Sequence, residues 1–587
     1  MNNRSFRLLT LTIIILLILV SCSETGNISI SILETTDVHG VILPYDYIEN
    51  KELDASLASS LTYIKQVRNE KNAVFLLDNG DNLQGQPEVY YYNFIDTISP
   101  HLLTEVMNYM EYDCGTVGNH DVEAGHAVYD RLAKAYNFPL LAANAVDINS
   151  GLPYFKPYHI IEKKGIKIAV FGLVTPAIPN WLPPELYKGI EFRDMLETTK
   201  KWMPVILNEK PDLVVGLFHS GWDSSINAYK ESVSLSENGS AAVAYNVPGF
   251  DIIFNGHDHK VANEQFVNSI GDTVLILDGG SRAEKIAQAD IIFSSERIKG
   301  KRRKVITGQI VNVDLYKPDP EFLVNFNTQH EIVDRYVNRV IGYSSSTISS
   351  RDSYFGPSAF IDMIHSIQLE LTGADISFAA PLSFDVQISE GPITVGDMFK
   401  LYRFENMLYT MILSGEEVKR YLEYSYSEWY NTMKSPDDNL LKLRLGKDGK
   451  ALLINGRVWL LNQPYNFDSA AGIDYTVDVS KPDGAKITIN GFSNGSKFYS
   501  NKKYKIAVNS YRGNGGGGHL TKGAGIDEIE LRSRLIASTN RDLRYYILKS
   551  IETKGTVNPM PLNNWKVIPE HLIKKAVSRE YDLLFGY

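Results

Sequence analysis

Apolar runs of strand length recur through the first half of the chain, and five short polar motifs directly follow such runs. The run that begins at Ile28 alternates with polar residues and leads into Thr35-Thr36-Asp37, as a strand that ends in a polar loop does. Amphipathic stretches of helix length, such as 57–67 and 195–207, separate several of the runs. Strands that alternate with helices predict a layered α/β domain. The motifs are Asp37-Val38-His39, Gly80-Asp81, Gly118-Asn119-His120-Asp121, Phe218-His219-Ser220 and Gly256-His257-Asp258-His259.

The residue types of these motifs are typical of a metal centre. Loops after strand carboxyl ends share one edge of a sheet, so side chains distant in sequence can converge there. Oxygen and imidazole ligands without thiolate suit Mn, Fe, Zn or Co. Seven such ligands exceed the need of one ion, and a two-metal centre requires a bridging ligand, for which Asp81 is the natural candidate. Singly, Asp37 could cap a turn and Asn119 could sit in a left-handed turn, but five motifs in this order favour two divalent ions.

The same constellation resembles the calcineurin-like metallophosphoesterase superfamily, from about residue 30 to about residue 290. The resemblance implies direct hydrolysis of a phosphate ester by water, which agrees with the absence of a Gly-x-Ser-x-Gly motif. It implies that His120 acts on the leaving oxygen and that Glu123 pairs with it, although a solvated glutamate is the alternative for Glu123. The implied ligands are Asp37, His39 and His259 on one ion, Asn119, His219 and His257 on the other, and Asp81 between them.

Length and pattern breaks predict two domains, because 587 residues exceed the ~100 to 200 of one ordinary domain. Residues 28–315 are expected to form the metallophosphoesterase domain, a four-layer β-sandwich flanked by helices. After Lys317-Pro318-Asp319-Pro320, apolar residues at helical spacing predict a linking helix within 316–345. Residues 346–570, rich in Gly, Tyr and short strands, are expected to form a second α/β domain.

The second region resembles the C-terminal domain of 5′-nucleotidases. The resemblance implies that Phe404, Asn406 and Tyr511 bind substrate and that the rings of Phe404 and Tyr511 clamp a nucleobase between them. The alternative is that both rings merely fill a core in a chain with 34 tyrosines. The segments that carry the resemblance are Gly391-Pro392-Ile393-Thr394-Val395-Gly396-Asp397, Arg403-Phe404-Glu405-Asn406 and Leu413-Ser414-Gly415.

Departures from the simple 5′-nucleotidase pattern indicate which branch of the 5′-nucleotidase relatives the chain resembles. Those enzymes usually carry Asn-Gly-Gly-x-Arg, whose arginine helps hold phosphate, where this chain reads Ala379-Ala380-Pro381-Leu382-Ser383. They also tend to carry an Asp at the position of Gly517. Segments such as Tyr465-Asn466-Phe467-Asp468 and Asn509-Ser510-Tyr511-Arg512 instead resemble bacterial 2′,3′-cyclic-nucleotide 2′-phosphodiesterase/3′-nucleotidases.

Three functions remain open on this basis. The first is hydrolysis of cyclic and 3′-nucleotides for salvage of nucleoside and phosphate. The second is a 5′-nucleotidase or nucleotide-sugar hydrolase on the same scaffold. The third is a surface-binding lipoprotein whose catalytic centre has decayed, against which the intact ligand set speaks.

The N-terminus predicts export. The apolar run Leu8–Val20 follows Arg4 and Arg7 and is too short for a spanning helix, so residues 1–22 are expected to be a signal peptide. Its end, Leu19-Val20-Ser21-Cys22, resembles the lipobox of bacterial lipoproteins, which implies lipidation of Cys22 and a lipid-anchored protein of the bacterial cell envelope, in the periplasm or at the cell surface. The alternative is a cleaved signal with an incidental cysteine. A net charge of −10 argues against binding of a nucleic-acid duplex. The oligomeric state is left open.

Overall fold

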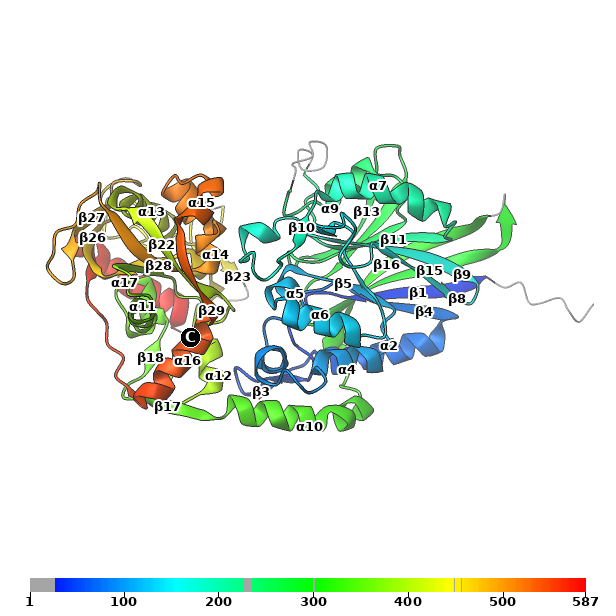
Figure 1. Ribbon diagram of the computed structural model, residues 1–587, viewed down its shortest axis with the longest axis horizontal. Helices are drawn as coiled ribbons and strands as arrows, with labels where there is room; N and C mark the ends of the chain where they lie inside the picture. The colour runs from blue at the N-terminus through cyan, green and yellow to red at the C-terminus, as the bar shows by residue number, and fades with distance from the viewer. Residues whose placement is uncertain (1–26, 226–234, 299–300, 448, 455–456, 587) are drawn as a thin grey trace, which may run out of the picture.

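The computed structural model describes residues 27–225, 235–298, 301–447, 449–454 and 457–586. They fold into two domains, and helix α10 runs beneath the first domain and leads into the second (Figure 1). The predicted signal peptide, residues 1–22, and its Cys22 lie outside the described residues. Among the residues described, we find no helix whose length and apolar character would let it span a membrane.

Two six-stranded sheets form the centre of the first domain. Each sheet is mixed: in the first, β1, β4, β5 and β6 run parallel, and β15 and β16 add antiparallel pairs at one edge. In spatial order the first sheet contains β16 (Lys301–Asn312), β15 (Lys285–Ile298), β1 (Ile28–Thr35), β4 (Ala73–Asp78), β5 (Cys114–Thr116) and β6 (Leu140–Leu141). The second contains β13 (Val261–Val267), β14 (Thr273–Gly279), β12 (Ile252–Asn255), β11 (Leu213–His219), β9 (Ile166–Val174) and β8 (Tyr158–Lys163).

Helices cover both outer faces of this sandwich. Ile30 and Ile32 face the second sheet, whereas Leu33, on the other face of the same strand, packs against helices. Strands such as β4 are buried along their whole length, which is why they read as unbroken apolar runs. The predicted four-layer fold is therefore confirmed. The first sheet packs on α2 (Leu57–Glu70), α4 (Leu102–Tyr109), α6 (His126–Ala135) and α10 (Pro320–Val337), and the second on α7 (Met195–Asn208) and α9 (Ser240–Asn246).

A five-stranded mixed sheet organises the second domain, which confirms its predicted α/β class. Its two faces are buried in separate cores: Ile506 packs in one and Ala507 in the other. The strand order is β25 (Ser469–Ala471), β19 (Ile376–Ala379), β28 (Lys503–Asn509), β22 (Met407–Ser414) and β29 (Leu535–Asp542). The helices around it include α11 (Ala359–Thr372), α12 (Val395–Leu401), α13 (Gly415–Trp429), α14 (Ser510–Gly513), α15 (Glu528–Arg534) and α16 (Leu543–Lys554). A three-stranded sheet of β27 (Ile487–Phe492), β26 (Ile473–Asp478) and β31 (Trp565–Ile568) adjoins it.

Two predicted boundaries are wrong. The linking helix expected within 316–345 is α10, which begins where the side chain of Asp319 accepts from the N–H of Phe322 and ends at Val337. Val340, expected on that helix, instead begins strand β17 (Val340–Ser344), because this segment pairs with β21 (Gly391–Thr394).

The second domain also continues beyond residue 570. Helix α17 (Glu570–Phe585) buries Leu572, Ala576, Leu584 and Phe585 in a core of that domain. Their spacing is helical, so the amphipathic pattern extends the domain almost to the end of the chain.

Polar contacts join the two domains. Tyr90 Oη donates to Asp542 Oδ2 at 3.0 Å, and Asn514 Nδ2 donates to the main-chain oxygen of Trp181 at 3.1 Å. An ion pair of 2.8 Å between Arg532 and Glu185 lies in the same boundary. Helix α5 (Asn119–Glu123) lies on the side of the first domain that faces the second (Figure 1).

Candidate active site

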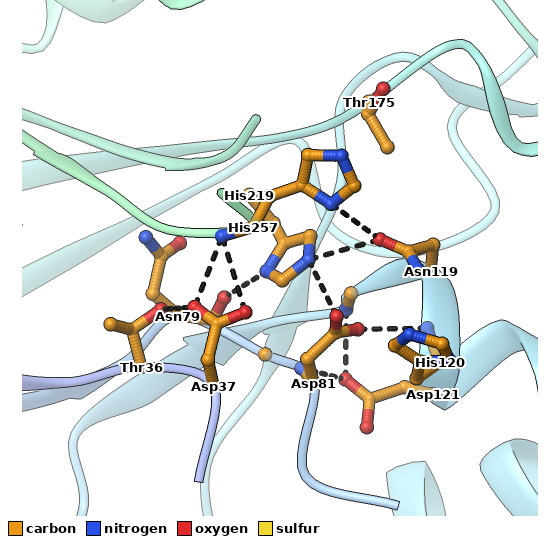
Figure 2. Close-up of polar contacts among 12 residues, drawn as sticks. Thr36, Asp37, Asn79, Asp81, Asn119, His120, Asp121, Thr175, His219 and His257 are labelled. Carbon is orange, nitrogen blue, oxygen red and sulfur yellow. Dashed lines mark hydrogen bonds and ion pairs between the residues drawn. The ribbon is translucent and has the colours of Figure 1, made fainter. Parts of the chain in front are cut away.

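The predicted metal ligands lie at strand carboxyl ends of both sheets of the first domain, where loops share one edge. Figure 2 shows the side chains of Asp37, Asp81, Asn119 and His219 turned toward one another. Asp37 and His39 follow β1, Asp81 follows β4, Asn119 begins α5, His219 ends β11, and His257 and His259 follow β12.

Most of these residues have an uncommon backbone conformation. The φ angles are 48° at Asp37, 50° at His39, 56° at Asp81, 81° at His257 and 57° at His259. Positive φ is rare for residues other than glycine, because Cβ crowds the main chain. Such strain concentrates where function fixes a side chain, so the backbone marks this loop cluster as a site independently of the residue types.

Two glycines allow the loops after β4 and β5 to touch. A Cβ on Gly80, which has φ 82°, would lie 2.4 Å from the nitrogen of Gly118. A Cβ on Gly118 would lie 2.0 Å from Asp81 Oδ1. A side chain at either position would therefore displace the Asp81 carboxylate.

Asp121 ties the same two loops together. Its Oδ2 accepts from the N–H groups of Asp81 and Gly118, each at 2.8 Å, and its Oδ1 accepts from those of Asn82 at 2.9 Å and Leu83 at 3.1 Å. Sequence reasoning quoted Asp121 within a motif but gave it no role. Its position three residues after the helix-capping Gly118 was the available signal, since an acidic side chain there reaches back to main-chain N–H groups.

Asp37, His39 and His259 form the first group of candidate ligands. Their ligand atoms lie within 4.8 Å of one another. His259 Nε2 is 3.3 Å from Asp37 Oδ1 and 3.0 Å from His39 Nε2. His39 Nδ1 lies 3.0 Å from the main-chain oxygen of Gln84, so donation of an Nδ1–H there leaves the Nε2 lone pair directed at the group.

Asp81, His219 and His257 form the second group. His219 Nε2 lies 3.1 Å from Asp81 Oδ2, and its Nδ1 lies 2.6 Å from the main-chain oxygen of Asn79 (Figure 2). Asn119 Oδ1 completes the group, 3.2 Å from His219 Nε2 and 2.7 Å from His257 Nδ1. Asp81 belongs by distance to this group, and its bridging of two ions stays a prediction.

Both groups fit divalent metal ions. Each combines a carboxylate with an imidazole whose remote nitrogen is hydrogen-bonded, His39 in the first group and His219 in the second, as metal-ligating histidines are in proteins. Burial alone would raise the pKa of Asp81, but the charges of His219 and His120 hold that pKa well below its usual range. The donor types suit Mn, Fe, Zn and Co alike. These residues would thus hold two divalent ions.

His120 lies beside the second group without belonging to it. Its main-chain N–H donates to Asp81 Oδ1 at 2.8 Å, and its Nδ1 lies 2.6 Å from Glu123 Oε2, so the pair that the sequence predicts is formed. Burial lowers the pKa of His120, but the charge of Asp81 and the hydrogen bond with Glu123 together raise it to about 10. A protonated imidazole in this position suits donation to a leaving oxygen.

Two further side chains touch His257, and sequence reasoning missed both. The ring of Trp181 stacks on the His257 ring with centroids 5.5 Å apart and planes at 26°. Glu237 Oε1 lies 3.0 Å from His257 Nε2, where it accepts a hydrogen bond and directs Nδ1 toward the second group. Both lie in loops outside any motif, so a single sequence carries no signal for them.

The predicted base-binding rings flank a third ring. Tyr465 makes edge-to-face contacts with Phe404, at 6.1 Å and 86°, and with Tyr511, at 6.4 Å and 89°. Asn406, the other predicted substrate residue, is only 7% exposed. Phe404 and Tyr465 also pack against a core, so the geometry is compatible with base stacking but leaves the core-filling alternative open.

In the second domain, Arg512 connects several loops near the predicted base-binding rings. Its buried guanidinium bonds both oxygens of Asp468, at 3.0 and 3.1 Å, and the main-chain oxygens of Tyr465 at 2.6 Å and Gly516 at 2.8 Å. Gly517 has φ 70°, and a Cβ there would lie 2.0 Å from Arg512 Nη1. An aspartate at position 517 has no room while Arg512 stays in place.

Family models match both halves of the chain. The calcineurin-like phosphoesterase model matches residues 30–261, and the 5′-nucleotidase C-terminal domain model matches residues 340–522.

The relatives extend the match to nearly the whole chain. A 2′,3′-cyclic-nucleotide 2′-phosphodiesterase/3′-nucleotidase of Haemophilus influenzae is 27% identical over 97% of this chain and 92% of its own length. A trifunctional nucleotide phosphoesterase of Bacillus subtilis is 26% identical over 93% of this chain, which spans 39% of that protein. A putative 5′-nucleotidase structure from Staphylococcus aureus shares the fold, with a TM-score of 0.73, 21% identity, and coverage of 92% of this chain and 99% of that one.

Loss of Asp81 should empty the site of metal more completely than loss of His259. Asp81→Ala removes a buried carboxylate of the second group, which is also the predicted bridge, whereas His259, at 46% side-chain exposure, serves only the first group. Elemental analysis of the purified variants should give about two ions per chain for wild type, about one for His259→Ala and fewer for Asp81→Ala. The control is His330→Ala, which removes a contact between His330 on α10 and Tyr47. Two ions in Asp81→Ala would contradict the assignment.

Proposed function

The chain belongs to the calcineurin-like phosphoesterases that carry a 5′-nucleotidase C-terminal domain, and we propose that it hydrolyses 2′,3′-cyclic nucleotides and 3′-nucleotides. One observation carries the proposal. Asn514, three residues after Tyr511, donates to Trp181, and the ring of Trp181 stacks on His257. The base-binding loop of one domain and the metal ligands of the other are thus adjacent, so one nucleotide can place its base and its phosphate at once.

Different residues have different roles in the proposed hydrolysis. Two divalent ions, when bound, supply Lewis-acid contact with phosphate oxygens and a water of lowered pKa. Protonated His120 donates to the oxygen that leaves, and Glu123 fixes the imidazole through Nδ1. Phe404 and Tyr511 stack the base, which tolerates any base because every base has a flat face.

The choice of cyclic and 3′-nucleotides over 5′-nucleotides rests on three observations. No arginine is present in the segment 379–383, where simple 5′-nucleotidases hold phosphate. Arg512 fills the space that an aspartate at 517 would need. A relative that covers 97% of the chain is named for the cyclic and 3′ activities. A 5′-nucleotidase or nucleotide-sugar hydrolase is the second candidate, favoured by the fold shared with a putative 5′-nucleotidase.

We also propose that the enzyme is exported and lipid-anchored in the bacterial cell envelope, where it salvages nucleoside and phosphate from RNA breakdown. The apolar run Leu8–Val20 and the cysteine that follows it support this location. A complete ligand set argues against a decayed centre, since loss of function would be expected to remove at least one ligand.

Kinetics with a panel of nucleotides test the proposed preference for cyclic and 3′-nucleotides. Wild type should have a higher kcat/KM for 2′,3′-cyclic AMP and 3′-AMP than for 5′-AMP, because the two features that favour 5′-monophosphates are missing. Steady-state release of phosphate or nucleoside gives the comparison. A kcat/KM for 5′-AMP that exceeds the others by about tenfold would make the branch wrong and leave the phosphoesterase assignment in place.

His120→Asn should lower kcat by roughly 10² to 10⁴ with metal content unchanged, because the imidazole acts on the leaving group and not on the ions. Glu123→Gln should lower kcat less, since an amide still accepts from Nδ1 but no longer raises the pKa of His120 by its charge. Elemental analysis accompanies the kinetics. Metal loss in His120→Asn would mean that His120 is misassigned.

Phe404→Ala and Tyr511→Ala should each raise the Michaelis constant for nucleotides by the equivalent of about 1 to 3 kcal/mol, and by similar amounts for adenine and uracil. Hydrolysis of p-nitrophenyl phosphate, which has no base, should change little. Tyr499→Ala, which removes a ring that is 44% exposed, is the control. Unchanged nucleotide kinetics in both variants would favour the core-filling interpretation.

Cys22→Ala should release the protein from membranes or leave an uncleaved precursor, since thirteen apolar residues alone give no durable anchor. Fractionation and intact-mass measurement distinguish the two outcomes. Membrane association of a correctly cleaved protein without Cys22 would indicate a different anchor.

A further inference from the structure

Arg282 lies beside the first group of metal ligands. Its main-chain N–H donates to the oxygen of Asp37 at 2.8 Å, which ties the loop after β14 to that ligand. Its Nη2 is 3.7 Å from Asp46 Oδ2, too far for a hydrogen bond. The other oxygen of Asp46 already accepts from the N–H groups of Ile48 at 3.0 Å and Glu49 at 3.1 Å. The guanidinium of Arg282 therefore makes an ion pair with Asp46 but no hydrogen bond to it.

Arg403 lies on the other side of the domain boundary, directly before Phe404. Its main-chain oxygen accepts from Arg544 Nη2 at 2.5 Å, and Arg544 also pairs with Glu405 at 3.0 Å, so the backbone here is fixed. The side chain of Arg403 is exposed and has no hydrogen-bond or ion-pair partner in the part of the chain that the structure describes. A rigid backbone thus presents an unpaired guanidinium next to the proposed base-binding ring.

The two guanidinium groups influence each other across the boundary. Surrounding protein atoms and then the charge of Arg282 lower the pKa of Arg403, and the charge of Asp46 only partly opposes them. A Cβ on Gly396, at the start of α12, would lie 3.5 Å from the main-chain oxygen of Tyr47, so the loop that carries Asp46 packs against the helix that leads to Arg403. Two positive charges near one engaged carboxylate leave a net positive charge at this boundary.

The reacting phosphate does not need this charge. Two divalent ions bring four positive charges, and the carboxylates of Asp37 and Asp81 remove two of them. The remaining two positive charges are enough for the reacting phosphate, which is a dianion in a 3′-nucleotide and a monoanion in a 2′,3′-cyclic nucleotide. Arginine forms strong, paired hydrogen bonds with phosphate oxygens. The guanidinium of Arg403, together with that of Arg282, whose hydrogen bonds are not taken up by Asp46, therefore suits a further phosphate.

We propose that Arg282 and Arg403 form a subsite for a second, non-reacting phosphate of the substrate. This inference rests on the proposed function: the reacting phosphate lies at the metal ligands and the base at Phe404 and Tyr511. The substrate class then includes nucleotides with phosphate on both the 3′ and 5′ sides, such as nucleoside 3′,5′-bisphosphates and short RNA fragments that end in a 2′,3′-cyclic phosphate.

Selectivity between two matched substrates tests the subsite. For the holoenzyme, the kcat/KM of adenosine 3′,5′-bisphosphate divided by that of 3′-AMP should fall about tenfold or more in Arg403→Ala and in Arg282→Ala. Arg403→Lys should retain part of the preference, because it keeps the charge but loses the paired donors. Arg303→Ala, on β16 at the opposite end of the first sheet from the metal ligands, should leave the ratio unchanged. An unchanged ratio in Arg403→Ala, or an equal loss for both substrates, would overturn the proposal.

Binding separates this inference from the proposed function. In metal-loaded His120→Asn, which turns over slowly, calorimetry should show tighter binding of adenosine 3′,5′-bisphosphate than of 3′-AMP, and adding Arg403→Ala should remove the difference. Equal binding of the two ligands before Arg403 is replaced would overturn the subsite. If 5′-AMP proves the best substrate, the proposed function fails, yet this binding ratio still decides whether the arginines hold a second phosphate. Thermal unfolding of each variant excludes loss of the fold as the cause.

Discussion

The carboxylate of Asp121 is the contact on which the rest of the site depends. By accepting four main-chain N–H groups it fixes the loops after β4 and β5 against each other, and Asp81, Asn119 and His120 all lie on those loops. The positive φ of Asp81 is therefore supported by a hydrogen bond from outside the predicted ligand set. Asp81 and Asn119 of the predicted ligand set can approach each other because Asp121, outside that set, orders their backbone.

In the second domain a buried positive charge, the guanidinium of Arg512, likewise orders loops. The guanidinium of Arg512 gathers the Tyr465 and Gly516 loops around Asp468, and thereby sets the spacing of the aromatic rings. Burial of this ion pair is tolerated because its donors are matched by carboxylate and carbonyl oxygens. One buried charged residue in each domain therefore organises loops from distant parts of the sequence.

The fold class could be predicted because strand burial and helix amphipathicity leave periodic patterns, as β4 and α7 show. The ligand types could be predicted because each follows a strand. Asp121 was missed because its partners are main-chain groups, which no side-chain pattern encodes. Trp181 and Glu237 were missed because they meet His257 only in the folded chain. The end of the linking helix was missed because pairing of β17 with β21 overrides the apolar spacing at Val340.

The close approach of Gly517 to Arg512 bears on how such enzymes diverge. With 2.0 Å between a Cβ at 517 and Arg512 Nη1, aspartate cannot enter at this position by a single substitution without dislodging the guanidinium that bonds Asp468. A lineage that acquires the aspartate must also replace or relocate the arginine, and either change alone passes through a less stable intermediate. A loop with aspartate at 517 and a loop with this buried arginine are therefore alternatives, and residues 512 and 517 have to change together.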